Sequence, residues 1–442
     1  MAAAAGVIAV AGVGAAAVVA SPIHMDLLDP GVEQTELPNG LCIVTEAMPE
    51  ARSVTLGAWV RVGGRDEPDE LSGASHFLEH LLFKGTERRS ARQIAEAIDS
   101  VGGEINAFTA REHTAYYARL PHARAALGLE ILADVLTAPA LRPAEVEAER
   151  QVIVEEILMN LEAPEDRVHT ALSRALFGDH PLGREVLGEM PTVEAISRDD
   201  IATFFARWYR PATMVITAAG RLDHAEIVDA VSAGFGGPEG GEPPERVAPA
   251  AAIERVVVEH DDTEQAHLSL GWRSLSNLDD DRWALSVANQ VLGGGMASRL
   301  FQEVREERGL AYSVYSHPTA FADSGYLTIY CGTSPKRARE ALAVIDDVVA
   351  TVLSEGITEQ ELAVAAGYLE GSMLLGLEDS GGRMGRLGRS LMQRDRVTSI
   401  DEHVLRLRAV TLDDVARVLH RVLDSPRCLA AVGPFNADSL VA

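Results

Sequence analysis

"GASHFLEHLLFKG", Gly73–Gly85, places His76, Glu79 and His80 in a run that is otherwise mostly apolar. Histidine and glutamate are costly to bury without a partner. If the run is a helix, the two histidines are one turn apart on one face, and the glutamate lies beside them. The run is therefore either an amphipathic helix with a few hydrated positions or a helix whose three polar side chains bind something.

The spacing H-x-x-E-H indicates metal chemistry. Two imidazoles one helical turn apart can share one Zn²⁺, while a carboxylate on the same face activates water. The order is the reverse of H-E-x-x-H and belongs to the known zinc-peptidase motifs. A catalytic zinc usually has three protein ligands, so we expect a third carboxylate or histidine on another element.

The candidate third ligands lie in "EAERQVIVEEI", residues 147–157, which is expected to be helical. It offers Glu147, Glu149, Glu155 and Glu156. Glu149 and Glu156 are seven residues apart and therefore share a face. Periodicity alone does not choose among the four, and a solvated helix face is the alternative interpretation.

Composition limits the function classes. The 442 residues are enough for two domains, and the formal net charge of -27 argues against nucleic acid as a partner. It favours cationic or neutral partners, unless the acidic surface serves solubility alone. The three cysteines, Cys42, Cys331 and Cys428, form no disulfide framework, which favours a reducing, cytoplasmic compartment.

The N-terminal 30 residues form an apolar extension with no Lys or Arg before Arg52. A secretory signal ordinarily begins with basic residues. We expect a disordered extension or a mis-assigned start, with export or membrane anchoring through this segment as the alternative to a cytoplasmic protein.

The rest of the chain alternates strand-like runs with long amphipathic stretches, which indicates an α+β fold. Glycine and proline dominate residues 234–252, which predicts a linker between domains at 31–233 and 253–442. Ser197–Gly220 and Thr411–Gly433 both read as a capped helix followed by a short strand ending in glycine. This similarity predicts that the two halves are related.

These motifs resemble the pitrilysin/insulinase family of zinc peptidases, which includes bacterial processing proteases and the β subunit of mitochondrial processing peptidase. The resemblance extends over roughly residues 36–434. It implies one Zn²⁺ per chain, held by His76, His80 and Glu156, and Glu79 as general base. It also implies that Glu149 orients the ligands and water. The second half contains no H-x-x-E-H, so only the first half is expected to bind metal.

Two further segments resemble substrate-binding parts of the family. "GGEINAFTAREHTAYY" resembles the edge strand beside the zinc, which implies that Asn106, Ala107 and Phe108 bind peptide substrate. The region around Gly293–Ser316 resembles the segment that supplies an arginine and a tyrosine, here Arg305 and Tyr312, to the substrate or intermediate. Without the resemblance, all five are ordinary hairpin, helix-surface or strand residues.

The resemblance implies two related α/β-roll domains, each an antiparallel sheet with helices on one face, forming a clamshell around a chamber. It implies a zinc-dependent endopeptidase acting on short or unfolded peptides, with basic peptides expected. The alternative is a non-catalytic scaffold or peptide-binding subunit of the same family. The complete set of motif residues favours the enzyme. A homodimer, or a heterodimer with a paralogous chain, is also implied.

Overall fold

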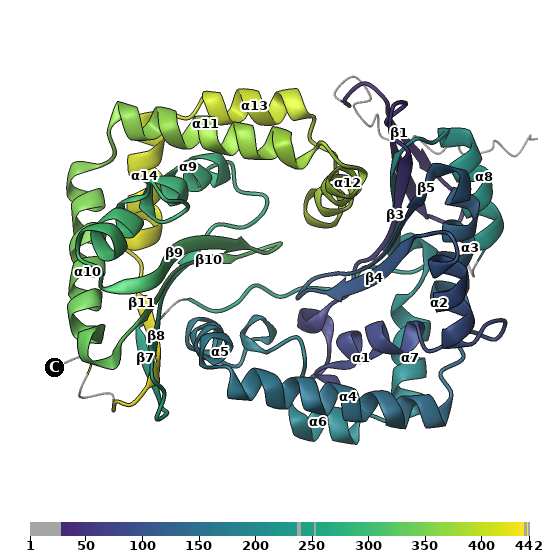
Figure 1. Ribbon diagram of the computed structural model, residues 1–442, viewed down its shortest axis with the longest axis horizontal. Helices are drawn as coiled ribbons and strands as arrows, with labels where there is room; N and C mark the ends of the chain where they lie inside the picture. Colours follow the sequence, from purple (N-terminus) through teal and green to yellow (C-terminus); the bar gives the residue numbers. More distant parts are fainter. Residues whose placement is uncertain (1–27, 237–239, 252, 437–439, 441–442) are drawn as a thin grey trace, which may run out of the picture.

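The computed structural model describes residues 28–236, 240–251, 253–436 and 440, and the predicted extension falls almost entirely outside them. Two sheets organise these residues (Figure 1). The first has the order β1-β2-β6-β3-β5-β4 and the second the order β7-β11-β8-β10-β9. The strands are β1 (Val32–Glu36), β2 (Cys42–Ala47), β3 (Ser53–Val60), β4 (Glu104–Thr109), β5 (Thr114–Pro121), β6 (Met214–Gly220), β7 (Arg255–His260), β8 (Ala266–Ser274), β9 (Ala311–Ala320), β10 (Gly325–Thr333) and β11 (Arg427–Gly433).

Helices connect and cover these strands. In the first half they are α1 (Ala74–Leu82), α2 (Ala91–Asp99), α3 (Ala125–Thr137), α4 (Pro143–Glu162), α5 (Pro164–Phe177), α6 (Met190–Ala195), α7 (Arg198–Trp208) and α8 (His224–Gly234). In the second half they are α9 (Arg282–Leu292), the π-helix η7 (Phe301–Glu307), α10 (Ala338–Glu355), α11 (Glu359–Gly376), α12 (Ser380–Arg394), α13 (Ile400–Arg408) and α14 (Leu412–Leu423). Among the described residues, no helix is long and apolar enough to cross a membrane. The α+β class is confirmed.

Both sheets are mixed, so the expectation of purely antiparallel sheets was wrong. β6 pairs in parallel with β2 and antiparallel with β3, and β11 pairs in parallel with β7 and antiparallel with β8. Each of these strands follows a helix. A strand that follows a helix is not joined to its neighbour by a short hairpin, which would impose antiparallel pairing. It can therefore lie parallel to one neighbour and antiparallel to the other.

The two halves are similar in the capped helix that precedes β6 and the capped helix that precedes β11. Ser197 caps α7 and Thr411 caps α14, and in each case an aspartate three residues later completes a capping box. The strands that follow, β6 and β11, occupy equivalent places in their sheets. The predicted correspondence of the two segments is therefore confirmed.

The halves exchange one helix each. α5, from the first half, packs on β8 and β11 of the second sheet. α12, from the second half, packs on β3 and β6 of the first sheet. Figure 1 shows both helices between the two facing sheets. Each sheet therefore has helices of its own half on one face, as predicted, and a helix of the other half on part of the opposite face.

Helix α8 ends at Gly234, the first residue of the predicted linker, and the other described residues of the linker, 235–236 and 240–251, form no helix or strand. The linker is nevertheless held by side chains of the first half. Arg246 pairs with Asp66 at 2.9 Å, and the Val247 carbonyl accepts a hydrogen bond from Arg65 at 2.9 Å. The domain limits at 31–233 and 253–442 stay predictions.

Candidate metal centre

Helix α1 carries the H-x-x-E-H residues, and its start is built around a buried carboxylate. Gly73 has φ 97°, a left-handed conformation that glycine adopts without strain. The Glu67 carboxylate accepts hydrogen bonds from the backbone N–H groups of Gly73 and Ser75, at 2.7 and 2.6 Å. Burial raises the pKa of Glu67 to about 7. Glu67 was not predicted as part of the site, because no spacing rule links it to the motif.

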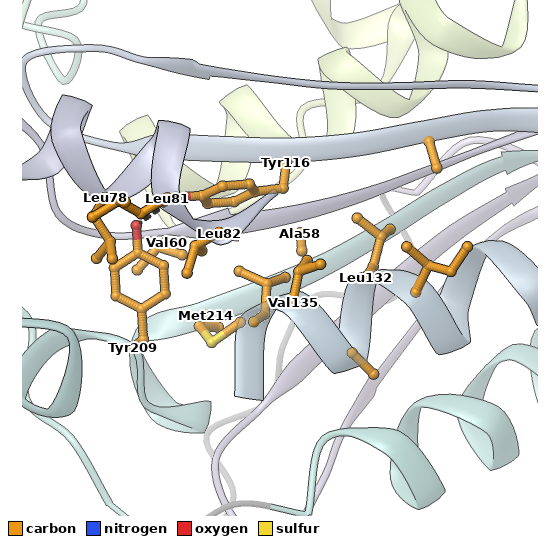
Figure 2. Close-up of a cluster of buried hydrophobic side chains, with 14 of the residues drawn as sticks. Ala58, Val60, Leu78, Leu81, Leu82, Tyr116, Leu132, Val135, Tyr209 and Met214 are labelled. Atoms are coloured by element: carbon orange, nitrogen blue, oxygen red, sulfur yellow. Dashed lines mark hydrogen bonds between the residues drawn. The ribbon is translucent and has the colours of Figure 1, made fainter. Parts of the chain in front are cut away.

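The apolar face of α1 fixes its orientation. Leu78, Leu81 and Leu82 pack into the core of the first half, where Tyr116 and Tyr209 form a hydrogen bond with each other (Figure 2). The three leucines are fully or almost fully buried. Their burial directs the motif residues to the other side of the helix.

The motif histidines meet one carboxylate from α4. Glu156 Oε2 lies 3.5 Å from His76 Nε2 and 3.6 Å from His80 Nε2. All three candidate ligand atoms lie within 4.8 Å of one another. Two ligands about 2.1 Å from a tetrahedral zinc would be roughly 3.4 Å apart. The three groups therefore can bind one zinc ion.

Two further observations support this fit. Glu156 Oε2 is buried and has no hydrogen-bond partner among the described residues, as expected of an atom whose natural partner is a cation. Burial, and then the neighbouring His80, lower the pKa of His76 to about 4. His76 is therefore neutral at pH 7, the state that binds a metal.

Glu149 lies behind His80. Its Oε2 is 3.2 Å from His80 Nδ1, and its Oε1 is 2.6 Å from Lys84 Nζ. A carboxylate on the second ring nitrogen of a metal-binding histidine fixes the tautomer and the ring orientation. This placement supports the predicted orienting role of Glu149. Of the other two candidates, Glu147 pairs with Arg150 and Glu155 is exposed.

Glu79 is tied to the edge of the sheet. Its Oε2 accepts a hydrogen bond from Thr109 Oγ1 at 2.5 Å. Burial raises the pKa of Glu79, while the Thr109 hydroxyl and His80 oppose the rise. Thr109 was not predicted, although it directly follows the predicted substrate-binding residues in β4.

The predicted substrate residues lie on an open edge. β4 is the last strand of the first sheet, and Phe108 is 39% exposed. The Phe108 ring packs edge-on against Trp59, with centroids 5.8 Å apart. Asn106 Oδ1 accepts a hydrogen bond from the Ala107 N–H at 2.8 Å. A peptide strand can pair with such an edge through main-chain hydrogen bonds.

Arg305 and Tyr312 lie together, but in the second half. The Arg305 guanidinium lies 5.0 Å from the centre of the Tyr312 ring, and that tyrosine is 81% exposed on the edge strand β9. Within the described part of the chain, no hydrogen bond or ion pair joins either side chain to the zinc group. The structure therefore brings the two predicted residues of this pair together.

Comparisons with known proteins agree with this picture. Residues 42–190 match the family model described as Insulinase (Peptidase family M16), and residues 195–367 match the one described as Peptidase M16 inactive domain. The second description agrees with the absence of H-x-x-E-H from the second half.

Similar sequences include an uncharacterized zinc protease of Streptomyces coelicolor, 45% identical, with 92% of this chain and 90% of that protein covered. An uncharacterized zinc protease of Mycobacterium tuberculosis is 45% identical, with 91% and 93% covered. YmxG of Bacillus subtilis, also an uncharacterized zinc protease, is 39% identical, with 90% and 97% covered.

Among solved structures, a protease from Helicobacter pylori matches with a TM-score of 0.87 at 23% identity, covering 92% of this chain and 100% of that one. A Pseudomonas fluorescens protein described as peptidase M16 inactive domain matches with a TM-score of 0.86 at 23% identity, covering 92% and 99%. These two matches confirm the two-domain fold. The chain therefore belongs to the insulinase family of zinc peptidases, peptidase family M16, as its motifs predicted.

Proposed function

We propose that this chain is a zinc-dependent endopeptidase that hydrolyses short or unfolded peptides between its two halves. The observation that carries the proposal is the buried Glu156 Oε2, which has no hydrogen-bond partner among the described residues and lies within 3.6 Å of both histidine Nε2 atoms. Glu79 lies on the same helix as the histidines, with a raised pKa suited to accepting a proton.

When bound by His76, His80 and Glu156, zinc would polarise the scissile carbonyl and lower the pKa of a water. Glu79 accepts a proton from the attacking water and then donates it to the leaving amine. Thr109 holds the Glu79 carboxylate in place through its hydrogen bond.

The peptide would pair with the open edge of β4 at Asn106, Ala107 and Phe108. Arg305 would bind a peptide carbonyl, and Tyr312 would stabilise the developing oxyanion. In this role the two halves close on the substrate, since the pair lies on η7 and β9 of the second half and the zinc group on α1 and α4 of the first.

The sequence also supports proposals for the substrates, the oligomeric state and the cellular location of the enzyme. The net charge of -27 favours capture of basic peptides. We propose a cytoplasmic enzyme that acts as a homodimer or with a paralogous subunit. Export or membrane anchoring through the N-terminal extension is the competing proposal.

The deciding experiment compares the wild type with Glu79→Gln, using Glu147→Gln as the matched control because Glu147 is exposed on α4. Zinc content and hydrolysis of quenched basic and acidic peptides are measured on the same samples. Glu79→Gln should keep its zinc and lose roughly 10²–10⁴-fold in hydrolysis, and Glu147→Gln should change neither. Near-normal turnover by Glu79→Gln would rule out Glu79 as the general base, and absence of hydrolysis by the zinc-loaded wild type would leave the non-catalytic, peptide-binding alternative.

A further inference from the structure

A second polar site lies apart from the zinc group, where α11, α12 and α13 meet. The site is a cavity of about 310 Å³, here called the α12 cavity. Its charged or titratable lining residues are Arg386, Arg389, Arg394 and His403, and no Asp or Glu is among the described residues that line it. A wholly basic lining is unexpected in a chain with a net charge of -27.

Not all of these charges are balanced. Arg386 is neutralised by Asp29 at 2.8 Å and Glu46 at 3.2 Å. Arg389 has neither an ion pair nor a side-chain hydrogen bond with any described residue. The Arg389 side chain is exposed, so it needs no protein partner, and it adds a positive charge to the lining that no described carboxylate balances.

Arg394 has only neutral partners. It donates hydrogen bonds to Ser390 Oγ at 3.1 Å and to Gln393 Oε1 at 3.5 Å. Loss of hydration lowers the pKa of Arg389 and of Arg394. Burial, followed by Arg394 and other arginines, lowers the pKa of His403 to about 4. The cavity is therefore lined by two arginines, Arg389 and Arg394, that no carboxylate of the described lining neutralises.

Unpaired polar atoms at the cavity wall support the same conclusion. Thr398 is 5% exposed, and its hydroxyl has no hydrogen-bond partner among the described residues. The Nε atoms of Arg386 and Arg394 are likewise buried without a partner in the described part of the chain. Buried polar groups are nearly always hydrogen-bonded, so such a group indicates a ligand or water. These atoms have almost no accessible surface, so an anion in the cavity reaches them only if nearby side chains move.

We propose that the α12 cavity binds a tetrahedral dianionic oxyanion of the phosphate or sulfate class. Guanidinium groups bind such anions through paired, charge-assisted hydrogen bonds, and hydroxyls complete the coordination. The cavity is at the lower end of the range of ligand pockets, about 300–1,000 Å³, which leaves room for the organic part of a phosphate monoester.

The position of α12 links the α12 cavity to the predicted substrate-binding edge at β4. This helix packs on the first sheet, and Arg389 also lines a second cavity, of about 340 Å³, beside Phe108 of β4. A bound anion would tie α12 to α11 and α13 and neutralise Arg389 at the edge of that second cavity.

The test is calorimetric titration of the zinc-loaded full chain with sodium sulfate, with ionic strength held constant by sodium chloride. One sulfate per chain is expected. Arg389→Gln combined with Arg394→Gln should weaken binding by at least about tenfold, because two charge-assisted hydrogen-bonding groups are removed. The control is Arg396→Gln, which removes a nearby arginine that pairs with Glu402 and does not line the cavity, and it should leave the affinity within about twofold.

Two further variants locate the bound anion in the α12 cavity. Thr398→Val removes an unpaired hydroxyl, so the variant should fold as stably as the wild type and bind sulfate more weakly. Glu156→Gln should lose zinc and keep its sulfate affinity, which separates this site from the proposed catalytic one. Glycerol phosphate, titrated in parallel, distinguishes a monoester from the free anion by its tighter binding. Absence of sulfate binding, unchanged binding in the double arginine variant, or loss of binding in Glu156→Gln would overturn the proposal.

Discussion

Glu149 shows how one residue can act on the metal centre without touching the metal. It contacts the far nitrogen of His80 and the Lys84 ammonium. Glu149→Gln keeps the shape of the side chain and removes its charge, so zinc affinity should fall by about 10–100-fold and one zinc should still bind at saturation. Competition with a chelator measures the affinity. Complete loss of zinc would instead place Glu149 among the ligands.

The pH dependence of hydrolysis should report Glu79. Its pKa is raised above the ordinary value of 4.5, and only the carboxylate can accept a proton, so kcat/KM should fall as pH decreases through that raised value. His76, with a pKa of about 4, stays neutral over this range. Thr109→Val removes a hydrogen bond that favours the carboxylate and should move the acid limb to higher pH. An acid limb that Thr109→Val does not move would contradict the assignment to Glu79.

At the residue scale, the sequence predicted the histidines and Glu79 directly, because their spacing along one helix is a local property. The third ligand lies on another helix. Helical periodicity left four glutamates open, and only the family resemblance selected Glu156, whose Oε2 the structure places beside both histidines. Thr109 and Glu67 were missed because their contacts depend on tertiary packing.

The start of helix α1 depends on one buried side chain, the carboxylate of Glu67. Glu67→Ala would leave the N–H groups of Gly73 and Ser75 without their acceptor. We expect a loss of about 1–3 kcal/mol in the free energy of unfolding and weaker zinc binding, since His76 directly follows Ser75. Asp223→Ala, which removes the exposed N-cap of α8, should cost about 1 kcal/mol and leave zinc affinity unchanged. Urea unfolding and zinc titration check both variants, and equal zinc affinity in the two would contradict this role of Glu67.

Elements were predictable where local patterns define them. The capping residues Ser197 and Thr411 correctly marked the starts of two equivalent helices. The parallel pairing of β6 with β2, and the packing of α5 and α12 on the sheet of the other half, were not predicted. Such choices depend on which distant surface is free when the chain folds, and no short sequence pattern specifies them.

At the scale of the whole molecule, a buried ionic cluster joins the halves. Arg65 pairs with Glu112 of the first half and with Asp323 of the second, each at 2.5 Å, and its side chain is 2% exposed. Glu112 also accepts a hydrogen bond from the Ala322 N–H at 3.0 Å. Arg65→Met should cost about 1–3 kcal/mol in unfolding free energy, because it removes the hydrogen-bond donor of the part-buried Glu112 and leaves that carboxylate with Arg246, 3.8 Å away, and the Ala322 N–H.

The matched control is Arg174→Met, since Arg174 pairs with Glu189 on the surface. That change should cost about 0–1 kcal/mol. Urea unfolding of both variants measures the difference, and equal losses would show that the cluster does not stabilise the packing of the halves.

We expect His76, His80 and Glu156 to bind one zinc ion. The most direct measurement is zinc per chain in purified wild type, His80→Ala and Glu156→Gln, each dialysed against the same metal-buffered solution. We predict one zinc in the wild type and a large loss of bound zinc in both variants. Undiminished zinc in both variants, with the fold intact, would contradict the assignment of the metal centre.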